Sequence, residues 1–160
     1  MKKRVSLAVL LALLLAISLS LSAFAVVEQG TGDGFYAVDE ANVLSEETEA
    51  GIASANAELE EQTGAQIVVV AVEYLDGYYA DEYAWKLFND WGVGDDAKDN
   101  GMLLLFATEE GKGWLVQGAG IADDFTDDTA AAYLDDYFWT DFDKGDYDGA
   151  VQTLFTQLVG

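Results

Sequence analysis

The sequence predicts an α/β fold, a three-layer α/β/α sandwich in which a small central sheet of about four strands is flanked by helices. Two strongly apolar runs, at residues 65–72 and 101–108, are typical of strands that are covered on both faces. Segments with apolar residues at helical spacing alternate with these runs along the chain. Because a strand that is buried on both faces needs a covering layer on each side, helices are expected above and below the sheet.

The first 25 residues are interpreted as a secretory signal rather than as part of the fold. A basic start at residues 1–4 is followed by an apolar run at residues 5–21, and Ala23-Phe24-Ala25 has the small-x-small form of a signal peptidase site. We expect cleavage after Ala25 and a secreted or extracytoplasmic protein that can associate with the cell envelope. The alternative is an uncleaved membrane anchor, because an apolar run of about 17 residues is at the short limit for a membrane span.

Residues 26–34 are small, polar and glycine-rich, and we expect a flexible leader there, ahead of one domain at residues 35–160. The first predicted helix begins after Ser45, a good N-cap residue, and ends at Gly64, which favours a left-handed C-cap. Its apolar positions recur at helical spacing at Ile52, Ala55 and Leu59. The β-branched run at residues 65–72 predicts the first buried strand.

A second helix is predicted between the two apolar runs and ends at Gly92. Its apolar stripe consists of Tyr83, Ala84, Leu87, Phe88 and Trp91. The second buried strand covers residues 101–108, and a turn leads into a third strand at residues 114–117, which predicts a hairpin. Two further helices complete the prediction. One is capped by Thr126 and includes Phe138 in its apolar stripe, and the other covers residues 147–159.

The charge of the chain is strongly negative once the predicted signal is set aside. Residues 26–160 contain all 30 acidic residues but only four of the seven basic ones, all lysines, so their formal net charge is −26. Such a surface repels nucleic acid and anionic lipid headgroups, and it attracts cations, divalent cations above all. The chain has no cysteine and no histidine, which excludes disulfides, Ser-His-Asp triads and zinc sites with sulfur or imidazole ligands. Calcium and magnesium, which prefer oxygen ligands, suit the side chains that remain.

One acidic segment combines negative charge with glycine and asparagine. Asp95, Asp96 and Asp99 lie in a glycine-bounded loop just before the second buried strand, and Asn100 completes that loop. Carboxylates and carbonyl oxygens on a tight loop are the ligands that a hard divalent cation prefers. The loop is therefore a candidate metal site. The alternative interpretation is an acidic loop that is simply solvated.

Two other acidic groups, residues 123–128 and 141–148, have plainer interpretations. The first group can complement the positive end of a helix dipole. The second begins like an EF-hand loop, but Asp146 stands at the sixth position, where the EF-hand has glycine. Its twelfth position is Gln152 rather than glutamate, so an EF-hand is excluded.

Several motifs follow one another along the chain in a recognisable order. They are Val38–Ser45, Thr63–Val70, Glu82–Gly94, Asp99–Leu105, Gly118–Gly120 with Thr126-Asp127, and Gly145–Tyr147. Together they resemble the TPM domain of thylakoid and bacterial envelope proteins, which is sometimes described as a phosphatase. The resemblance covers residues 35–158, and its most specific mark is Asp99-Asn100-Gly101 at the entry to the second buried strand. Ala122 departs from the family pattern, which usually has a glutamate there.

The resemblance implies an α/β/α sandwich with a cleft near the sheet edge where Asp39, Asp99, Asn100 and Asp127 converge. Members of the family have been linked to divalent-cation binding, to acid phosphatase activity, and to the assembly or repair of membrane complexes. We therefore expect these four residues, helped by Asp95 or Asp96, to bind calcium, with magnesium as the alternative. The domain is then expected to act through contacts with envelope or membrane proteins.

Two other functions stay open, so the sequence does not decide whether the protein is an enzyme. A metal-dependent acid phosphatase would use the same carboxylates, with the metal activating water. Against it, residues 26–160 contain no arginine, the usual clamp for a phosphate group. A plain acidic interaction module would instead present an aromatic patch made of Tyr78, Tyr79, Tyr137 and Trp139.

Overall fold

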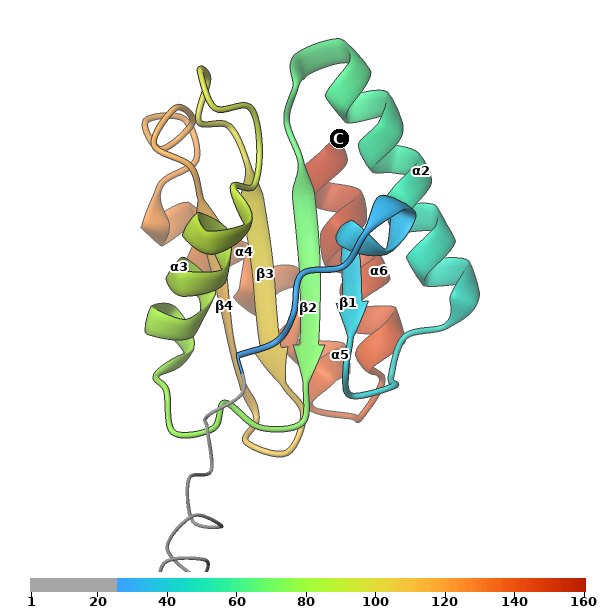
Figure 1. Ribbon diagram of the computed structural model, residues 1–160. Helices are drawn as coiled ribbons and strands as arrows, with labels where there is room; N and C mark the ends of the chain where they lie inside the picture. The colour runs from blue at the N-terminus through green and yellow to red at the C-terminus, as the bar shows by residue number, and fades with distance from the viewer. Residues whose placement is uncertain (1–25) are drawn as a thin grey trace, which may run out of the picture.

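A four-stranded sheet lies at the centre of residues 26–160, the part of the chain that this computed structural model describes (Figure 1). The strands occur in the sheet in chain order: β1 (Ala37–Asp39), β2 (Ile67–Val72), β3 (Met102–Ala107) and β4 (Lys112–Gln117). The first three are parallel, and β4 returns antiparallel to β3, which confirms the predicted hairpin. The predicted signal, residues 1–25, lies outside the described residues.

The two apolar runs form the central strands, as the sequence predicts. Every residue of β2 and β3 is buried. Alternate residues point to opposite faces of the sheet, so Val68 and Val70 pack on one side while Ile67 and Val69 pack on the other. The sheet therefore separates two apolar clusters, and the predicted three-layer α/β/α arrangement is confirmed.

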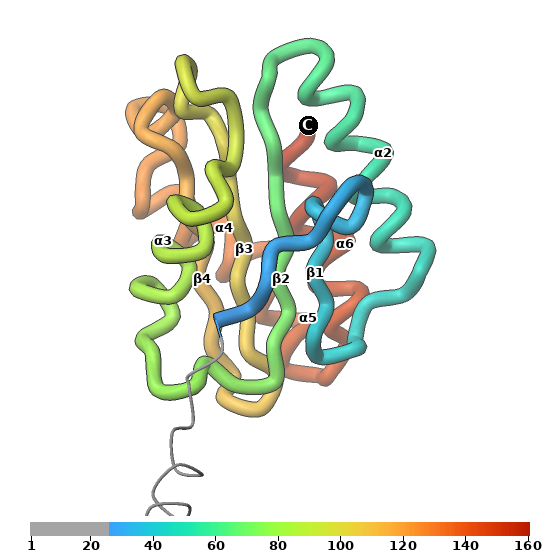
Figure 2. The backbone as a smooth tube through the Cα atoms, in the orientation of Figure 1, coloured from blue at the N-terminus to red at the C-terminus, as the bar shows by residue number. Residues whose placement is uncertain are grey.

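One face of the sheet is covered by α3 (Ala80–Trp91), whose Tyr83 and Leu87 are almost completely buried. The rest of that face is covered by the N-terminal segment, which includes the short 3-10 helix η1 (Gly32–Phe35). Residues 26–34, predicted as a flexible leader, thus lie across the sheet instead of extending away from the domain (Figure 2). We call residues 26–36 the N-terminal strap.

The other face carries four helices: α2 (Glu46–Thr63), α4 (Asp127–Tyr137), α5 (Trp139–Phe142) and α6 (Tyr147–Val159). The Phe106 ring of β3 lies at the centre of their packing, with ring centroids 5.4 Å from Phe138 and 6.0 Å from Phe142. The helix predicted to include Phe138 ends one residue before it, because the chain breaks there between α4 and α5.

The helix ends agree with the capping residues predicted from the sequence. The Ser45 hydroxyl accepts a hydrogen bond from the Thr48 amide at 3.2 Å, and Gly64 closes α2 with a φ of 77°. The long helices begin with acidic residues, but none of the described helices has a basic residue in its last turn. In residues 26–160, the helices are too short or too polar to cross a membrane.

Candidate functional site

The predicted ligands lie at opposite ends of the parallel strands. We call the side of the sheet where these strands begin the amino edge, and the side where they end the carboxyl edge. Asp39 ends β1 and pairs with Ala71, near the carboxyl end of β2. Asp99 precedes β3, whose first residue, Met102, pairs with Ile67 at the amino end of β2. Four residues of β2, roughly 13 Å at about 3.3 Å per residue, separate the two levels. The expectation that Asp39 and Asp99 share a cleft is therefore wrong, because one follows its parallel strand and the other precedes its own.

The acidic loop at the amino edge is held in shape by its own side chains. One carboxylate oxygen of Asp95 accepts hydrogen bonds from the Ala97 and Lys98 amides, at 2.9 Å and 3.0 Å. The Asn100 side chain accepts from the Asp95 amide at 3.1 Å and donates to the Thr63 carbonyl at 3.2 Å. Asp95 and Asn100 thus have structural roles, which the sequence alone did not distinguish from metal ligation.

The other predicted ligands near this edge point to two different places. Asp96 and Asp99, together with Asp95, line a hollow of about 220 Å³ beside the end of α3. Asp127 instead accepts a hydrogen bond from the buried Gln117 side chain at 2.6 Å and lines a separate groove beside β4. The amino edge therefore brings together Asp95, Asp96 and Asp99 but does not add Asp127 to them.

Asp39, at the carboxyl edge, has one carboxylate oxygen with a partner and one without. Its Oδ2 accepts a hydrogen bond from the Leu44 amide at 2.7 Å, which fixes the turn between β1 and α2. Its Oδ1 is buried and has no hydrogen-bond partner, and within residues 26–160 it is the single buried side-chain oxygen or nitrogen in this state. Such an atom calls for an explanation, because a buried acceptor without a donor costs free energy.

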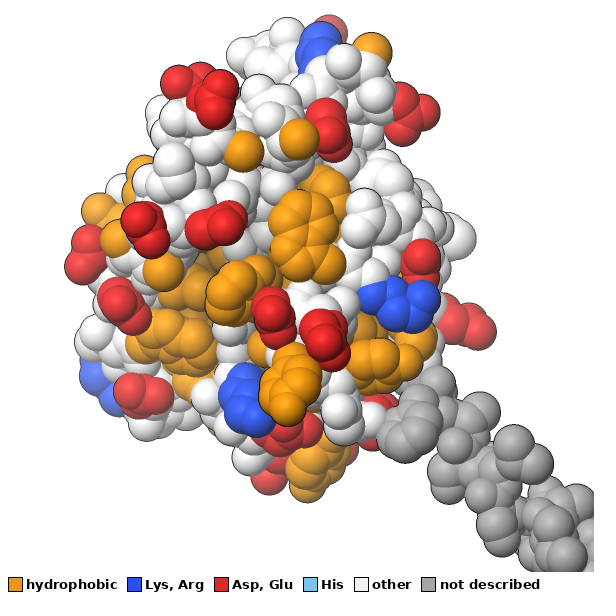
Figure 3. All heavy atoms as spheres, turned by 90° about the vertical axis from the view of Figure 1, so that its left-hand side faces the viewer, with side chains coloured by type: hydrophobic (Ala, Val, Ile, Leu, Met, Phe, Trp, Pro, Cys, Tyr) orange, Lys and Arg blue, Asp and Glu red, His pale blue; other side chains and the backbone are white. Residues whose placement is uncertain are grey.

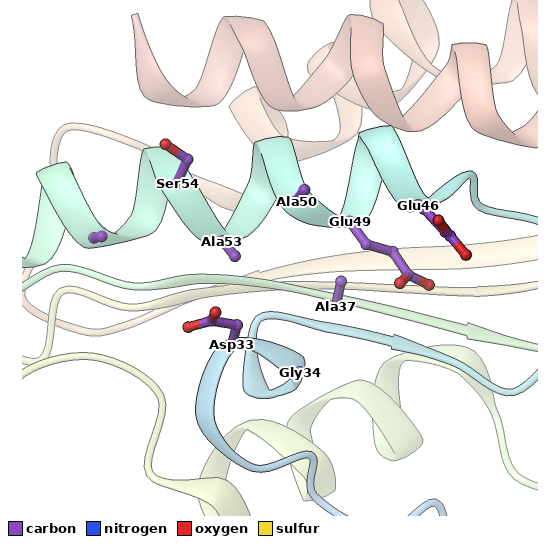
Figure 4. Close-up of a pocket in the computed structure, with 9 residues that line it drawn as sticks. Asp33, Gly34, Ala37, Glu46, Glu49, Ala50, Ala53 and Ser54 are labelled. Carbon is purple, nitrogen blue, oxygen red and sulfur yellow. The ribbon is translucent and has the colours of Figure 1, made fainter.

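Glu49, in the first turn of α2, lies close enough to Asp39 and to Glu46 for their charges to interact. Partial burial raises the pKa of Glu49, and the negative charges of Asp39 and Glu46 raise it further. Glu46 and Glu49 line a cavity of about 480 Å³ between α2 and the segment that carries η1 and β1 (Figure 4). Glu49 extends from α2 toward Ala37 of β1. We call Asp39, Glu46 and Glu49 the carboxyl-edge cluster.

From the sequence alone, the two glutamates are expected only to favour the start of a helix. Their spacing of three residues, which puts both on one side of the helix, is the signal that could have linked them to Asp39. The oxygen atoms of the cluster suit a hard divalent cation. As positioned, no three acidic side chains within residues 26–160 enclose a metal ion.

Residues 37–160 match the family model of the TPM domain, which is more than half of the chain. The chain belongs to the TPM domain family. This confirms the resemblance inferred from the motifs. None of the curated proteins compared with the chain matches it.

Three solved structures share the fold of this TPM domain. The N-terminal domain of a protein from P. gingivalis has a TM-score of 0.71 and 20% identity, over 78% of this chain and 79% of that one. The BA42 protein of the psychrophilic bacterium Bizionia argentinensis has a TM-score of 0.61 and 20% identity, over 74% and 81%. The N-terminal domain of the cg2496 protein from Corynebacterium glutamicum has a TM-score of 0.61 and 15% identity, over 85% and 86%. At these identities, the likeness shows the fold alone.

The aromatic residues proposed as an interaction patch do not form one surface in this TPM domain. Tyr78 stacks on Tyr83 in the cluster under α3, whereas Tyr137 and Trp139 pack into the cluster on the opposite face. The face formed by α3 and β4 instead exposes Trp85 and Trp114, and apolar side chains there are interspersed with carboxylates (Figure 3).

Proposed function

We propose that this TPM domain is an extracytoplasmic module that binds a divalent cation, calcium in the first instance, at Asp39 and Glu49. The observation that carries the proposal is the buried Oδ1 of Asp39, which has no hydrogen-bond donor. Leaving such a group unpaired costs about 1–3 kcal/mol, and more when it is charged. A cation beside Asp39 and Glu49 supplies the missing partner and offsets the repulsion between the two carboxylates.

The chemistry of the carboxyl-edge cluster favours calcium. Calcium takes six to eight oxygen ligands in a flexible geometry, so Asp39 and Glu49, with Glu46 beside them, can hold it while water fills the other positions. Magnesium, which keeps most of its own water, is the alternative ion. Because Asp39 also binds the Leu44 amide, a cation there connects the turn after β1 to the first turn of α2. We propose that this stiffened surface contacts envelope or membrane proteins.

The positions of the lysines support binding rather than phosphate hydrolysis. A phosphatase needs positive groups that stabilise the transferred phosphate. Lys86 and Lys144 form ion pairs with Asp90 and Asp141, at 2.6 Å and 2.8 Å. Lys98 donates to the Thr63 carbonyl, and the amine of Lys112 lies 3.8 Å from Glu110. Within residues 26–160, all four lysines therefore have partners other than the carboxyl-edge cluster.

Calcium is expected to raise the melting temperature of the protein, by on the order of 8 °C at one hundred times the dissociation constant. The rise follows because the ion binds the folded state only. Asp39→Asn and Glu49→Gln are expected to remove it, since each takes away one negative ligand without changing side-chain size. The measurement is a thermal melt in calcium and magnesium titrations, starting from chelator-treated protein.

The matched control is the double variant Asp96→Asn/Asp99→Asn, which removes two carboxylates from the acidic loop at the other edge of the sheet. It is expected to keep the full calcium response. If it alone loses the response, the ion binds in the loop and the assignment to Asp39 is wrong. If the unsubstituted protein melts at one temperature across both titrations, the cation-binding proposal fails.

The phosphatase alternative has its own assay. We expect the purified protein with magnesium to hydrolyse a chromogenic phosphate ester no faster than buffer does. Turnover that disappears in both Asp39→Asn and Glu49→Gln would show instead that the cluster is catalytic. Turnover that persists in these variants points to a contaminating enzyme.

A further inference from the structure

We infer that a second acidic pocket binds a primary ammonium group, and that its occupant is the α-amino group created at Val26 when the signal is removed. The pocket has a volume of about 540 Å³ and lies at the carboxyl end of β2, beside the start of the N-terminal strap. This inference goes beyond the cation proposal, because it concerns another pocket and another ligand. It draws on the predicted cleavage after Ala25.

The lining of the pocket suits an organic cation. Four carboxylates and two phenol rings face it, and its lining includes no lysine: Glu28, Glu40, Glu73, Asp76, Tyr74 and Tyr83. Carboxylates accept the hydrogen bonds of an ammonium group, and aromatic faces attract a cation through their quadrupole. Val72 and Val27 supply apolar walls around these groups. These acidic residues alone do not identify a ligand. The ligand is identified by the position of Val26, which lies at the pocket.

The start of the strap already lies in this pocket. Val26 and Val27 both line it, and both pack against the apolar cluster beneath α3. The Val27 amide donates a hydrogen bond to the Tyr83 hydroxyl at 3.0 Å, and the Gln29 side chain donates to the Trp91 carbonyl at 3.2 Å. The strap is thus attached on both sides of Glu28, and the bond that signal peptidase is predicted to cut directly precedes a residue of the pocket.

Cleavage changes the charge at this point and nowhere else in the domain. In the precursor, the nitrogen of Val26 is a neutral amide. In the cleaved protein it is an α-amino group, whose ordinary pKa of about 8 leaves it largely protonated at pH 7. The new positive charge is attracted to the pocket carboxylates and fastens the strap over the sheet. Removal of the signal therefore strengthens the attachment of the strap to the face of the sheet that it shares with α3.

The experiment compares two forms of the chain that begin at Val26, one with a free α-amino group and one acetylated there. Both are measured at pH 7 in chelator, so that cation binding at Asp39 does not contribute and cannot mask the result. We expect the acetylated form to melt about 4 °C lower. In the double variant Glu73→Gln/Asp76→Asn, we expect acetylation to change the melting temperature by less than about 1 °C.

The control is the double variant Glu58→Gln/Glu61→Gln on α2, which removes the same charge far from the pocket and should keep the full effect of acetylation. Equal melting of the free and acetylated forms overturns the inference, as does an effect that survives in Glu73→Gln/Asp76→Asn. An intact mass of the exported protein that places its first residue elsewhere than Val26 overturns it as well. If a variant does not fold, hydrogen exchange at the Val27 amide in the two unsubstituted forms decides, with slower exchange expected for the free amine.

Discussion

Replacing Gly101 by alanine is expected to lower the free energy of unfolding by about 3 kcal/mol. An added Cβ would lie 2.1 Å from the Val93 carbonyl oxygen and 2.9 Å from the Gly94 nitrogen. Both neighbours are backbone atoms, so neither can rotate away. The Asp99-Asn100-Gly101 motif thus includes a glycine because two backbone segments meet there.

Gly51→Ala is the matched control, because nothing lies within 4 Å of the Cβ that it adds. It sits in the interior of α2, where alanine favours the helix, and we expect it to stabilise the protein by about 0.5–1 kcal/mol. Urea denaturation of both variants measures the two free energies. A Gly101→Ala protein as stable as the unsubstituted one would mean that the backbone at Val93 moves freely.

Asn56→Ala is expected to cost about 3 kcal/mol, because it removes three buried hydrogen bonds at once. The Asn56 side chain donates to the Ile52 and Ile67 carbonyls, both at 2.9 Å, and accepts from the Ile67 amide at 2.7 Å. It therefore ties the middle of α2 to the first residue of β2. Without it, the buried amide and carbonyl of Ile67 have no side-chain partner from α2.

Asn89→Ala provides the comparison, since Asn89 also donates to the carbonyl four residues earlier but lies on the exposed side of α3. We expect it to change stability by less than about 0.5 kcal/mol. Chemical denaturation curves of the two variants test the difference. Similar losses for Asn56→Ala and Asn89→Ala would show that the link between α2 and β2 contributes little.

The elements that the sequence predicted well are those defined by short-range patterns. β2 and β3 are continuous apolar runs, and Ser45 and Gly64 have the backbone geometry that these residue types favour at helix ends. The break at Phe138 is not evident from the sequence, because this side chain is buried whether the helix continues through it or ends before it. The path of the strap was missed because its contacts with Tyr83 and Trp91 are more than 50 residues away in sequence.

The candidate site was only partly predictable. Asp39 was identified, but Glu49 became its neighbour only through the packing of α2 beside β1. The family motif grouped Asp39 with Asp99 although they belong to opposite edges of the sheet, since a motif records residue types and not strand ends. The sequence predicts Asn100 as a ligand because an amide that stabilises a loop and an amide that binds calcium look alike in sequence.

The unbalanced helix ends have a consequence for the response of the domain to salt. Each long helix has negative residues at its start and no positive ones at its end. Because residues 26–160 contain 30 acidic residues and only four lysines, most of their charges repel one another. Raising the ionic strength from about 0.1 M to 1 M shortens the screening length from about 10 Å to 3 Å and weakens that repulsion. Sodium chloride, which destabilises proteins that depend on surface ion pairs, should therefore raise the melting temperature of this domain.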